Sequence, residues 1–250
     1  MISGFGFWQW QNRGVVVGTS AARVSEGVTQ SMSLEVATQD CSALTEAQFE
    51  EFLTIEGSFT AEQFAKAGTD WVLCTLARID GKLHGVTFST LERIGGTPCV
   101  LLGLMTIKRT AKRDSILKGL MTEAYHRALM AFPDEDVVVG SRFATADGME
   151  AMKAVTEMIP TFGHRAVGEE RAWGRRLARR FGVDSTYDEK TFIVASGGQS
   201  GFLDHESLKP EKISPEITSL FEGVNPKKGG VLIVHGWTMA ESLVKLGARV

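Results

Sequence analysis

The stretch from Cys99 to Thr145 constrains the fold of this chain more than any other part. It runs as an apolar strand (CVLLGLMTI), a basic polar turn (KRTAKRDS), a helix (ILKGLMTEAYHRALMAF) and a second apolar strand (DVVVGSRFAT). Apolar residues recur along the helix at intervals of three and four residues, so one of its faces is expected to pack against a sheet. Two strands joined by a helical crossover are expected to lie parallel in one sheet, with a right-handed connection. The stretch therefore predicts a sheet with at least one parallel pair.

The residues before this stretch predict an antiparallel meander. The alternating runs WVLCTLARI and KLHGVTFSTLERI flank Asp80-Gly81, a strong hairpin signal, and Gly95-Gly96 marks the next turn. Further upstream, an alternating strand (SLEVATQD) precedes helices that begin near Ser42 and Thr60. After the second apolar strand, DGMEAMKAVTEM predicts another helix. We therefore expect an α/β fold of the α+β type, with a mixed, mostly antiparallel sheet flanked by helices.

The composition fits one globular domain with extensions at both ends. The 250 residues, 43% of them hydrophobic and 23% charged, can bury a core of ordinary size. Residues 1–31 are rich in Gly, Ser, Val and Thr without helical periodicity, so we expect a flexible N-terminal extension there. We expect the domain to span residues 32–196, and residues 197–250 to form a C-terminal extension packed on the core.

Charge and cysteine content argue against several classes of protein. The net charge of −3 gives no general attraction to nucleic acid or to anionic membranes. No apolar run approaches the roughly 18 residues of a membrane span, and the N-terminal residues lack the pattern of a signal peptide. The three cysteines are widely spaced with no CxxC pair, which disfavours a disulfide framework or a zinc site. We therefore expect a cytoplasmic protein without a metal, a nucleic-acid partner or a membrane partner.

The basic turn after the first apolar strand is a candidate anion site. A strand that ends in a turn opening a helix directs unpaired backbone N–H groups and the positive end of the helix dipole at one spot. Lys108, Arg109, Lys112 and Arg113 add four positive charges there. The alternative is an ordinary solvated turn, in which these charges bind no ligand.

This order of elements resembles the GNAT superfamily of acyltransferases, which use acyl-coenzyme A. CVLLGLMTI matches the family's fourth strand, KRTAKRDSILKGLM its pyrophosphate turn and following helix, and DVVVGSRFATADGMEAM its fifth strand and next helix. The family's turn usually reads Arg or Gln, two residues, Gly, one residue, then Gly or Ala. In the best register these positions hold Lys112, Ser115 and Leu117, so both small positions are changed.

The resemblance implies acetyl-CoA or another acyl-CoA as co-substrate, and it implies where that molecule would bind. In the family, the pantetheine arm runs along the end of the fourth strand, which here holds Met105, Thr106 and Ile107. The pyrophosphate would lie at the turn, beside Lys112, Arg113, Asp114 and Ser115. Glycines normally let the backbone approach the pyrophosphate closely, so charged side chains would carry more of the binding in this chain.

Acyl transfer also needs a base for the attacking amine or hydroxyl and an acid for the leaving thiolate. His84 and Glu92 are the candidate bases; they are eight residues apart, so an unbulged strand would put them on one face. The family often supplies the acid from a Tyr on the helix after its fifth strand, and this chain has none there. Arg142 and Asp147 flank the end of that strand as candidate substrate-binding or supporting residues, or as an ordinary salt bridge or helix cap.

Three hypotheses for the function follow. The first is direct transfer of an acetyl or other acyl group to an amine or hydroxyl of a small molecule or protein. The second is a longer-chain acyltransferase resembling the homoserine-lactone synthases, with an apolar channel lined by Met105, Met121, Phe143 and Met149. The third is a non-catalytic protein of the same fold that binds a ligand or a partner.

Overall fold

The computed structural model describes residues 16–17, 33–152, 155–197 and 213–248. The strands are β1 (Val16–Val17), β2 (Leu34–Asp40), β3 (Leu73–Ile79), β4 (Lys82–Ile94), β5 (Thr97–Ile107), β6 (Val137–Phe143), β7 (Thr156–Ile159), β8 (Tyr187–Asp188), β9 (Ile193–Val194) and β10 (Val231–Thr238). The α-helices are α1 (Glu46–Phe52), α2 (Ala61–Asp70), α3 (Arg113–Ala131), α4 (Gly168–Arg180), α5 (Pro215–Ser219) and α6 (Ala240–Leu246). Short 3-10 helices are η1 (Cys41–Ala43), η2 (Ala146–Met152), η3 (Asp184–Thr186) and η5 (Pro226–Lys228).

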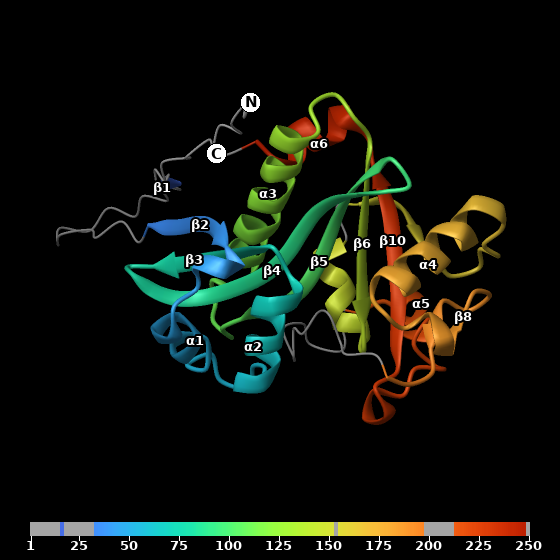
Figure 1. The fold of residues 1–250 in the computed structure, drawn as a ribbon, viewed down its shortest axis with the longest axis horizontal. Helices are drawn as coiled ribbons and strands as arrows, with labels where there is room; N and C mark the ends of the chain where they lie inside the picture. Colours follow the sequence, from blue (N-terminus) through green and yellow to red (C-terminus); the bar gives the residue numbers. More distant parts are fainter. Residues whose placement is uncertain (1–15, 18–32, 153–154, 198–212, 249–250) are drawn as a thin grey trace, which may run out of the picture.

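One mixed sheet forms the centre of the described part (Figure 1). Its strands follow the order β1-β2-β3-β4-β5-β6-β10-β9-β8, and β7 pairs with β10 beside this path. β5 and β6 are parallel, whereas the other pairs are antiparallel. The mixed, mostly antiparallel sheet is therefore confirmed. Strand, two helices, meander, helix and parallel strand follow one another as expected of a GNAT-like fold.

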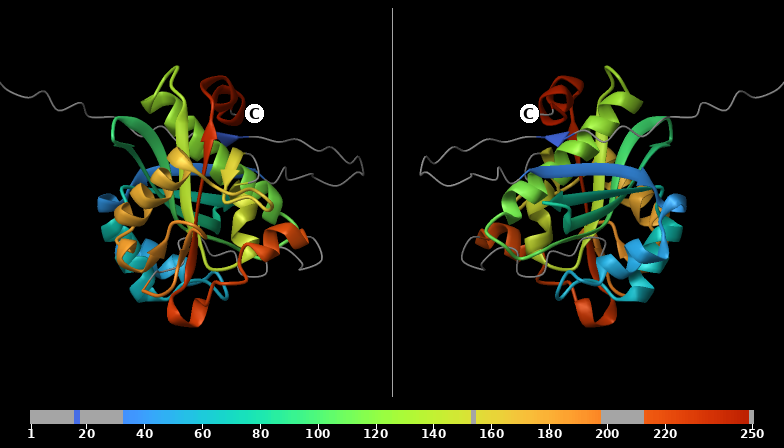
Figure 2. Two further views of the ribbon diagram at one scale, coloured as in Figure 1. Left: turned by 90° about the vertical axis from the view of Figure 1, so that its right-hand side faces the viewer. Right: turned by 90° about the vertical axis from the view of Figure 1, so that its left-hand side faces the viewer.

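Helices cover both faces of the sheet (Figure 2). α3 packs on one face, in an apolar cluster that includes Val100 and Leu102 of β5. α1, α2 and α4 cover the other face, in a second cluster that includes Cys99 and Leu101. Successive side chains of a strand point to opposite faces, so a strand covered on both sides has to be apolar throughout. The unbroken apolar run of β5 reflects that burial.

The local signals in the sequence mark real turns and helix starts. Asp80 and Gly81 have φ angles of 50° and 75°, the left-handed conformation of a two-residue hairpin turn. Thr60 accepts a hydrogen bond from the backbone N–H of Gln63, and the Gln63 side chain accepts one from the Thr60 N–H. The predicted crossover helix is α3, with Ile116 and Leu120 fully buried against the sheet.

One prediction of secondary structure differs from the structure. The helix expected in DGMEAMKAVTEM is only the 3-10 helix η2, and its last residues begin strand β7. β7 pairs with β10, so the ladder with a distant strand overrides the local helical pattern.

The C-terminal residues contribute a strand to the central sheet. β10 pairs with β6 over seven residues and with β7 and β9 on its other side. It is therefore an interior strand of the sheet. Four successive apolar residues of this strand are fully buried: Val231, Leu232, Ile233 and Val234. The boundary between residues 196 and 197 stays a prediction, and the N-terminal extension lies almost wholly outside the described residues.

Candidate functional site

The parallel strands β5 and β6 separate at one end. Their ladder joins Cys99–Leu101 to Val138–Gly140, after which β5 runs on to Ile107 and β6 to Phe143. At the point of separation, the Ser141 hydroxyl donates a hydrogen bond to the Leu102 carbonyl over 3.0 Å. We call residues 102–107 of β5 the open edge, because the ladder to β6 does not extend along them.

A β-bulge accompanies the separation. Thr87 of β4 pairs with Met105 and Ser89 with Leu102, so β5 holds one extra residue between these pairs. The extra residue lies at Gly103 or Leu104, immediately beyond the end of the parallel ladder. Bulges bend a strand and increase its twist, which turns β5 away from β6.

The open edge leads directly into the basic turn. Lys108, Arg109 and Lys112 are exposed, and Lys112 is the N-cap residue of α3 without a side-chain cap hydrogen bond. The first backbone N–H groups of a helix have no intrahelical partners, so this end can receive an anion. The candidate residue Ser115 is also exposed, in the first turn of α3.

Arg113 does not behave like its three basic neighbours. Its side chain is only 7% exposed and forms an ion pair with Asp114 over 2.9 Å. A guanidinium that is largely buried and ion-paired is less accessible to a phosphate than an exposed lysine, and the contact between Arg113 and a phosphate stays a prediction. Asp114 engages that guanidinium while remaining largely exposed. Leu117, at the second changed position of the motif, packs in the core beneath α3.

The three residues expected along a pantetheine arm lie on the open edge. Met105, Thr106 and Ile107 are almost completely buried, with exposures of 1%, 0% and 0%. The Thr106 hydroxyl has no hydrogen-bond partner in the described part of the chain. A buried hydroxyl without a partner is costly, and in this conformation Thr106 exposes no surface to a ligand.

The face opposite α3 has an aromatic wall at the same place. The Trp71 ring lies against Gly103 so closely that a Cβ added there would come within 2.4 Å of it. The Phe181 ring lies 6.4 Å from Trp71, and the Arg142 guanidinium stands over Phe181 at 4.7 Å. Burial lowers the pKa of Arg142 to about 10, so it stays a cation at neutral pH. Trp71 and Phe181 are not among the residues predicted for the site. The available signal was Gly103 within an apolar strand, because such a glycine often marks the close approach of another group.

His84 and Glu92 lie far apart on β4. Leu83 pairs with Arg78 and Gly85 with Ala77, so His84 is the extra residue of a second bulge. The argument from the sequence assumed an unbulged strand, and β4 is not one. Eight residues of strand separate the two by about 26 Å, so they cannot act on one reacting centre. The Lys108 N–H donates to the His84 carbonyl over 2.7 Å, which places His84 beside the basic turn.

Glu92 lies at the closed end of the parallel pair. It pairs with Cys99 of β5, and its carboxylate accepts a hydrogen bond from Arg180 Nε over 2.6 Å. His84 has the lower pKa expected of a half-buried ring, because burial disfavours its charged form and Lys108 repels it. His84 is therefore neutral near pH 7 and able to accept a proton, whereas Glu92 is engaged elsewhere.

The candidate supporting residues lie where the second strand ends. Arg142 is on β6, two residues beyond the ladder, and Asp147 is in the first turn of η2. Tyr125 and Tyr187 offer no acid at this place: burial raises the pKa of both phenols, and they pack in α3 and against Phe192 respectively.

Within the described residues, no group of three or more His, Cys, Asp or Glu side chains could hold a metal ion. No described helix is both long and apolar enough to cross a bilayer.

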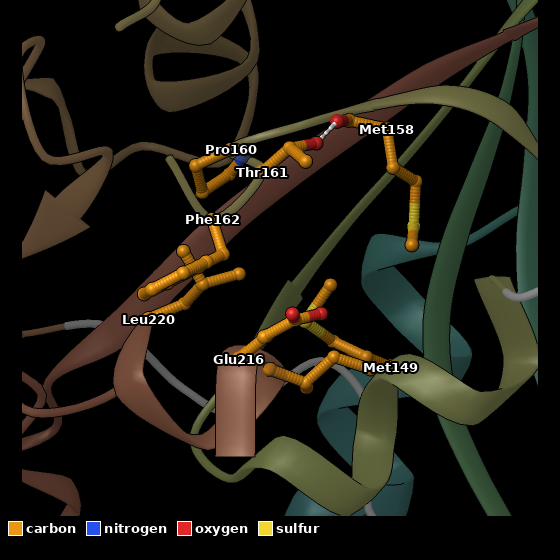
Figure 3. Close-up of a pocket in the computed structure, with 8 residues that line it drawn as sticks. Met149, Met158, Pro160, Thr161, Phe162, Glu216 and Leu220 are labelled. Carbon is orange, nitrogen blue, oxygen red and sulfur yellow. Dashed lines mark hydrogen bonds between the residues drawn. The ribbon is translucent and has the colours of Figure 1, made fainter. Parts of the chain in front are cut away.

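A separate cavity of about 160 Å³ lies beyond η2 (Figure 3). The segment around Pro160 forms one side, α5 forms another, and Met149 of η2 forms a third. Met149 also belongs to the apolar cluster that contains Met105.

Comparisons with solved structures return acetyltransferases of low similarity. An aminoglycoside acetyltransferase from an uncultured soil sample is 16% identical, with a TM-score of 0.33, over 42% of this chain and 76% of that one. The IAA acetyltransferase of Bacillus cereus is 11% identical (TM-score 0.36; 55% and 91% covered). A GNAT-family acetyltransferase of Streptococcus pneumoniae is 13% identical (TM-score 0.34; 52% and 90% covered).

Neither of the two sequence-level comparisons adds a relative. No family model matches this chain, and no curated protein matches it. The TM-scores of the three named structures are all below 0.5. The GNAT-like fold of this chain therefore rests on its own strand order, its parallel β5–β6 pair and the bulge in β5.

Proposed function

We propose that this chain is an acyltransferase that moves an acetyl or other acyl group from acyl-CoA to an amine or hydroxyl of a small molecule or protein. The observation that carries the proposal is the open edge of β5, which leads directly into an exposed basic turn at the start of α3. A strand edge without its neighbour offers backbone N–H and C=O groups to an extended, amide-containing ligand. Pantetheine is such a ligand, and its phosphates would lie beside Lys108 and Lys112.

The residues of the site divide the work as follows. The open edge, which includes Thr106, binds and orients the pantetheine arm. Lys112 and the first N–H groups of α3, with Ser115 beside them, hold the pyrophosphate, while Asp114 keeps Arg113 in place. The thioester supplies the activated acyl group. Trp71, Phe181 and Arg142 line the side from which the acceptor approaches, with Asp147 supporting the end of β6.

For the proton transfer, we propose His84 in preference to Glu92. His84 lies at the end of β4 beside the basic turn and stays neutral near pH 7. Glu92 lies about 26 Å away along the strand and is bound to Arg180. Replacing His84 by Gln should reduce turnover and remove the acidic limb of its pH profile, whereas Glu92→Gln should affect stability more than turnover.

The binding step can be tested without knowing the acceptor. Calorimetric titration with acetyl-CoA is expected to give saturable binding. The double change Lys108→Ala with Lys112→Ala should weaken it about tenfold at low salt and less at high salt, because exposed charges are screened. Lys227→Ala, an exposed lysine distant in the chain, is the matched control. Absence of binding to any acyl-CoA would overturn the proposal.

A longer acyl chain is the second candidate, and it depends on the methionine-rich packing near the open edge. Met105, Met121, Phe143 and Met149 belong to one buried apolar cluster, rather than lining an open channel. Methionine side chains rearrange readily, so this cluster could open around an acyl chain. Affinity that rises from acetyl-CoA to hexanoyl-CoA and octanoyl-CoA would favour this candidate. Tight binding without turnover on any acceptor would favour the non-catalytic alternative.

A further inference from the structure

The cavity beyond η2 is apolar on most of its surface. Its apolar lining residues are Met149, Met158, Pro160, Phe162, Ile217 and Leu220. Thr161 lies among them, but its hydroxyl donates to the Met158 carbonyl and is thereby satisfied. Glu216 is the remaining lining residue, so the cavity combines an apolar wall with a single carboxylate.

The size of the cavity limits what can enter it. Its volume of about 160 Å³ is close to that of an apolar cavity of ~150 Å³ known to take up benzene. One six-membered ring or a branched alkyl group of similar size would therefore fit. The flexible thioethers of Met149 and Met158 can adapt to either shape.

The mouth of the cavity exposes both an aromatic ring and a charge. Phe162 is 57% exposed, so its ring presents apolar surface at the mouth of the cavity. Glu216 is exposed on α5, and no hydrogen bond or ion pair engages its carboxylate within the described residues. Figure 3 shows this carboxylate reaching from α5 toward the space between Leu220 and Met149.

From these features we infer that the cavity binds a compact apolar amine. The ring or alkyl group fills the space between Met158, Phe162 and Leu220, and the protonated amine pairs with Glu216 at the mouth. The carboxylate disfavours an anion of the same shape, because like charges would be brought together at a partly desolvated site. The inference concerns a site outside the proposed acyl-CoA site and does not depend on acyl transfer.

Three probes of one shape test the charge preference. Benzylamine, benzyl alcohol and benzoate share a ring but carry a positive, no and a negative charge at neutral pH. Calorimetric titration of the full chain without any acyl-CoA should give saturable binding of benzylamine, weaker binding of benzyl alcohol and none of benzoate. No binding of benzylamine by the folded protein, or equal binding of benzylamine and benzoate, would overturn the inference.

Three variants of lining residues and one control variant locate the binding. Phe162→Ala removes an exposed wall and should weaken benzylamine about tenfold, as expected for lost burial of a ring. Glu216→Gln should weaken benzylamine about fivefold or less, as an exposed pair allows, and bring it level with benzyl alcohol. Glu222→Gln, just beyond α5 and outside the lining, is the matched control and should change nothing. Leu220→Trp should fill the cavity and abolish binding.

The variants also decide where any measured binding occurs. Thermal melting of each variant shows whether it is folded, and Phe162→Ala keeps the test valid if Leu220→Trp does not fold. Benzylamine binding that survives both Phe162→Ala and Leu220→Trp in folded protein would place the ligand elsewhere and overturn the inference. The acyl-CoA titrations are separate, so failure of one proposal leaves the other unchanged.

Discussion

His235 is a buried imidazole in the middle of β10, with 1% of its surface exposed. Its Nε2 lies 3.1 Å from the backbone carbonyl of Glu170, so the neutral ring donates a hydrogen bond there. Its Nδ1 is buried without a partner in the described part of the chain. Protonation would add a charge and an unsatisfied N–H in the core, and burial accordingly lowers the pKa of His235 to about 4.

This lowered pKa predicts a loss of stability in mild acid. The unfolded chain takes up a proton near pH 6.5 and the folded chain only near pH 4, so stability is full above pH 6.5 and falls as the pH drops between these values. Between pH 7 and pH 5 the free energy of unfolding should fall by about 2 kcal/mol. Urea unfolding at pH 7 and at pH 5 measures this difference in the free energy of unfolding.

The variant His235→Gln tests the source of that pH dependence. It removes the titrating group, so most of the difference between pH 7 and pH 5 should disappear, whatever its own stability. His164→Gln, an exposed histidine paired with Glu170, is the control and should leave most of the difference in place. An unchanged pH dependence in His235→Gln would show that other groups cause it.

Gly103 shows how one small residue positions the wall of the proposed acceptor side. A Cβ at this position would lie 2.4 to 2.7 Å from three atoms of the Trp71 ring, which cannot shift freely because Trp71 is 7% exposed. Gly103→Ala should therefore lower the free energy of unfolding by about 1–3 kcal/mol through overpacking. Chemical denaturation followed by tryptophan fluorescence measures this loss. Adding Trp71→Leu should recover part of it; no recovery would mean that the strain lies in the backbone of β5.

At the scale of single residues, sequence reasoning could predict the basic turn but not the role of each cation in it. Lys112 and Arg113 are adjacent and similar in charge, yet Lys112 is exposed and Arg113 is buried. Which of them points outward depends on the angle at which α3 begins over the sheet. That angle is set by contacts such as those of Ile116 and Leu120 with residues distant in sequence.

α3 is held to the sheet by a polar contact as well as by its apolar stripe. Glu123 is buried and accepts hydrogen bonds from the Thr38 hydroxyl over 3.2 Å and from Arg127 Nε over 2.9 Å. The Thr38 hydroxyl also lies 2.8 Å from that of Thr75, so the contact joins α3 to β2 and β3. Buried polar groups of this kind are costly when one partner is lost.

Glu123→Ala should therefore weaken the docking of α3. The Thr38 hydroxyl would lose an acceptor, and we expect the free energy of unfolding to fall by about 1–3 kcal/mol. Urea unfolding measures the change, and Glu50→Ala, an exposed helical carboxylate, is the matched control with little effect. Adding Thr38→Val together with Thr75→Val should reduce the loss, since neither buried hydroxyl is then left without a partner. Equal losses in the two glutamate variants would contradict a role for this contact.

At the scale of elements, the meander and α3 could be predicted because their signals are local. Asp80-Gly81 and Gly95-Gly96 define hairpins whose strands are neighbours in sequence. η2 and β7 could not be predicted from DGMEAMKAVTEM, whose apolar spacing suits a helix. The segment that begins at Thr156 pairs with Trp237 of β10, about eighty residues later, and no local pattern encodes that partner.

The whole molecule depends on β10, which arrives from the far end of the chain. It fills the place beside β6 and connects β6 to β7, β9 and β8. Val231, Leu232, Ile233 and Val234 are fully buried, two of them in each of the apolar clusters on the two faces of the sheet. Because β10 is paired on both sides, we expect it to belong to the folding unit, whereas the sequence indicated an extension docked on the core.

Removing β10 should therefore abolish the cooperative fold. A chain ending at residue 230 would expose the edge of β6 and leave β7 and β9 without the strand they pair with. Among the described elements, a chain that begins at residue 32 loses β1, a two-residue edge strand, and should keep its melting temperature within a few degrees. Thermal unfolding followed by circular dichroism compares both with the full chain. If the chain ending at residue 230 melted cooperatively near the temperature of the full chain, residues 197–250 would be an extension docked on an independent core. We expect the opposite result: the cooperative fold is lost without β10 and kept without residues 1–31. The strand pair β6–β10 would then be part of the scaffold that holds the open edge of β5 apart from β6.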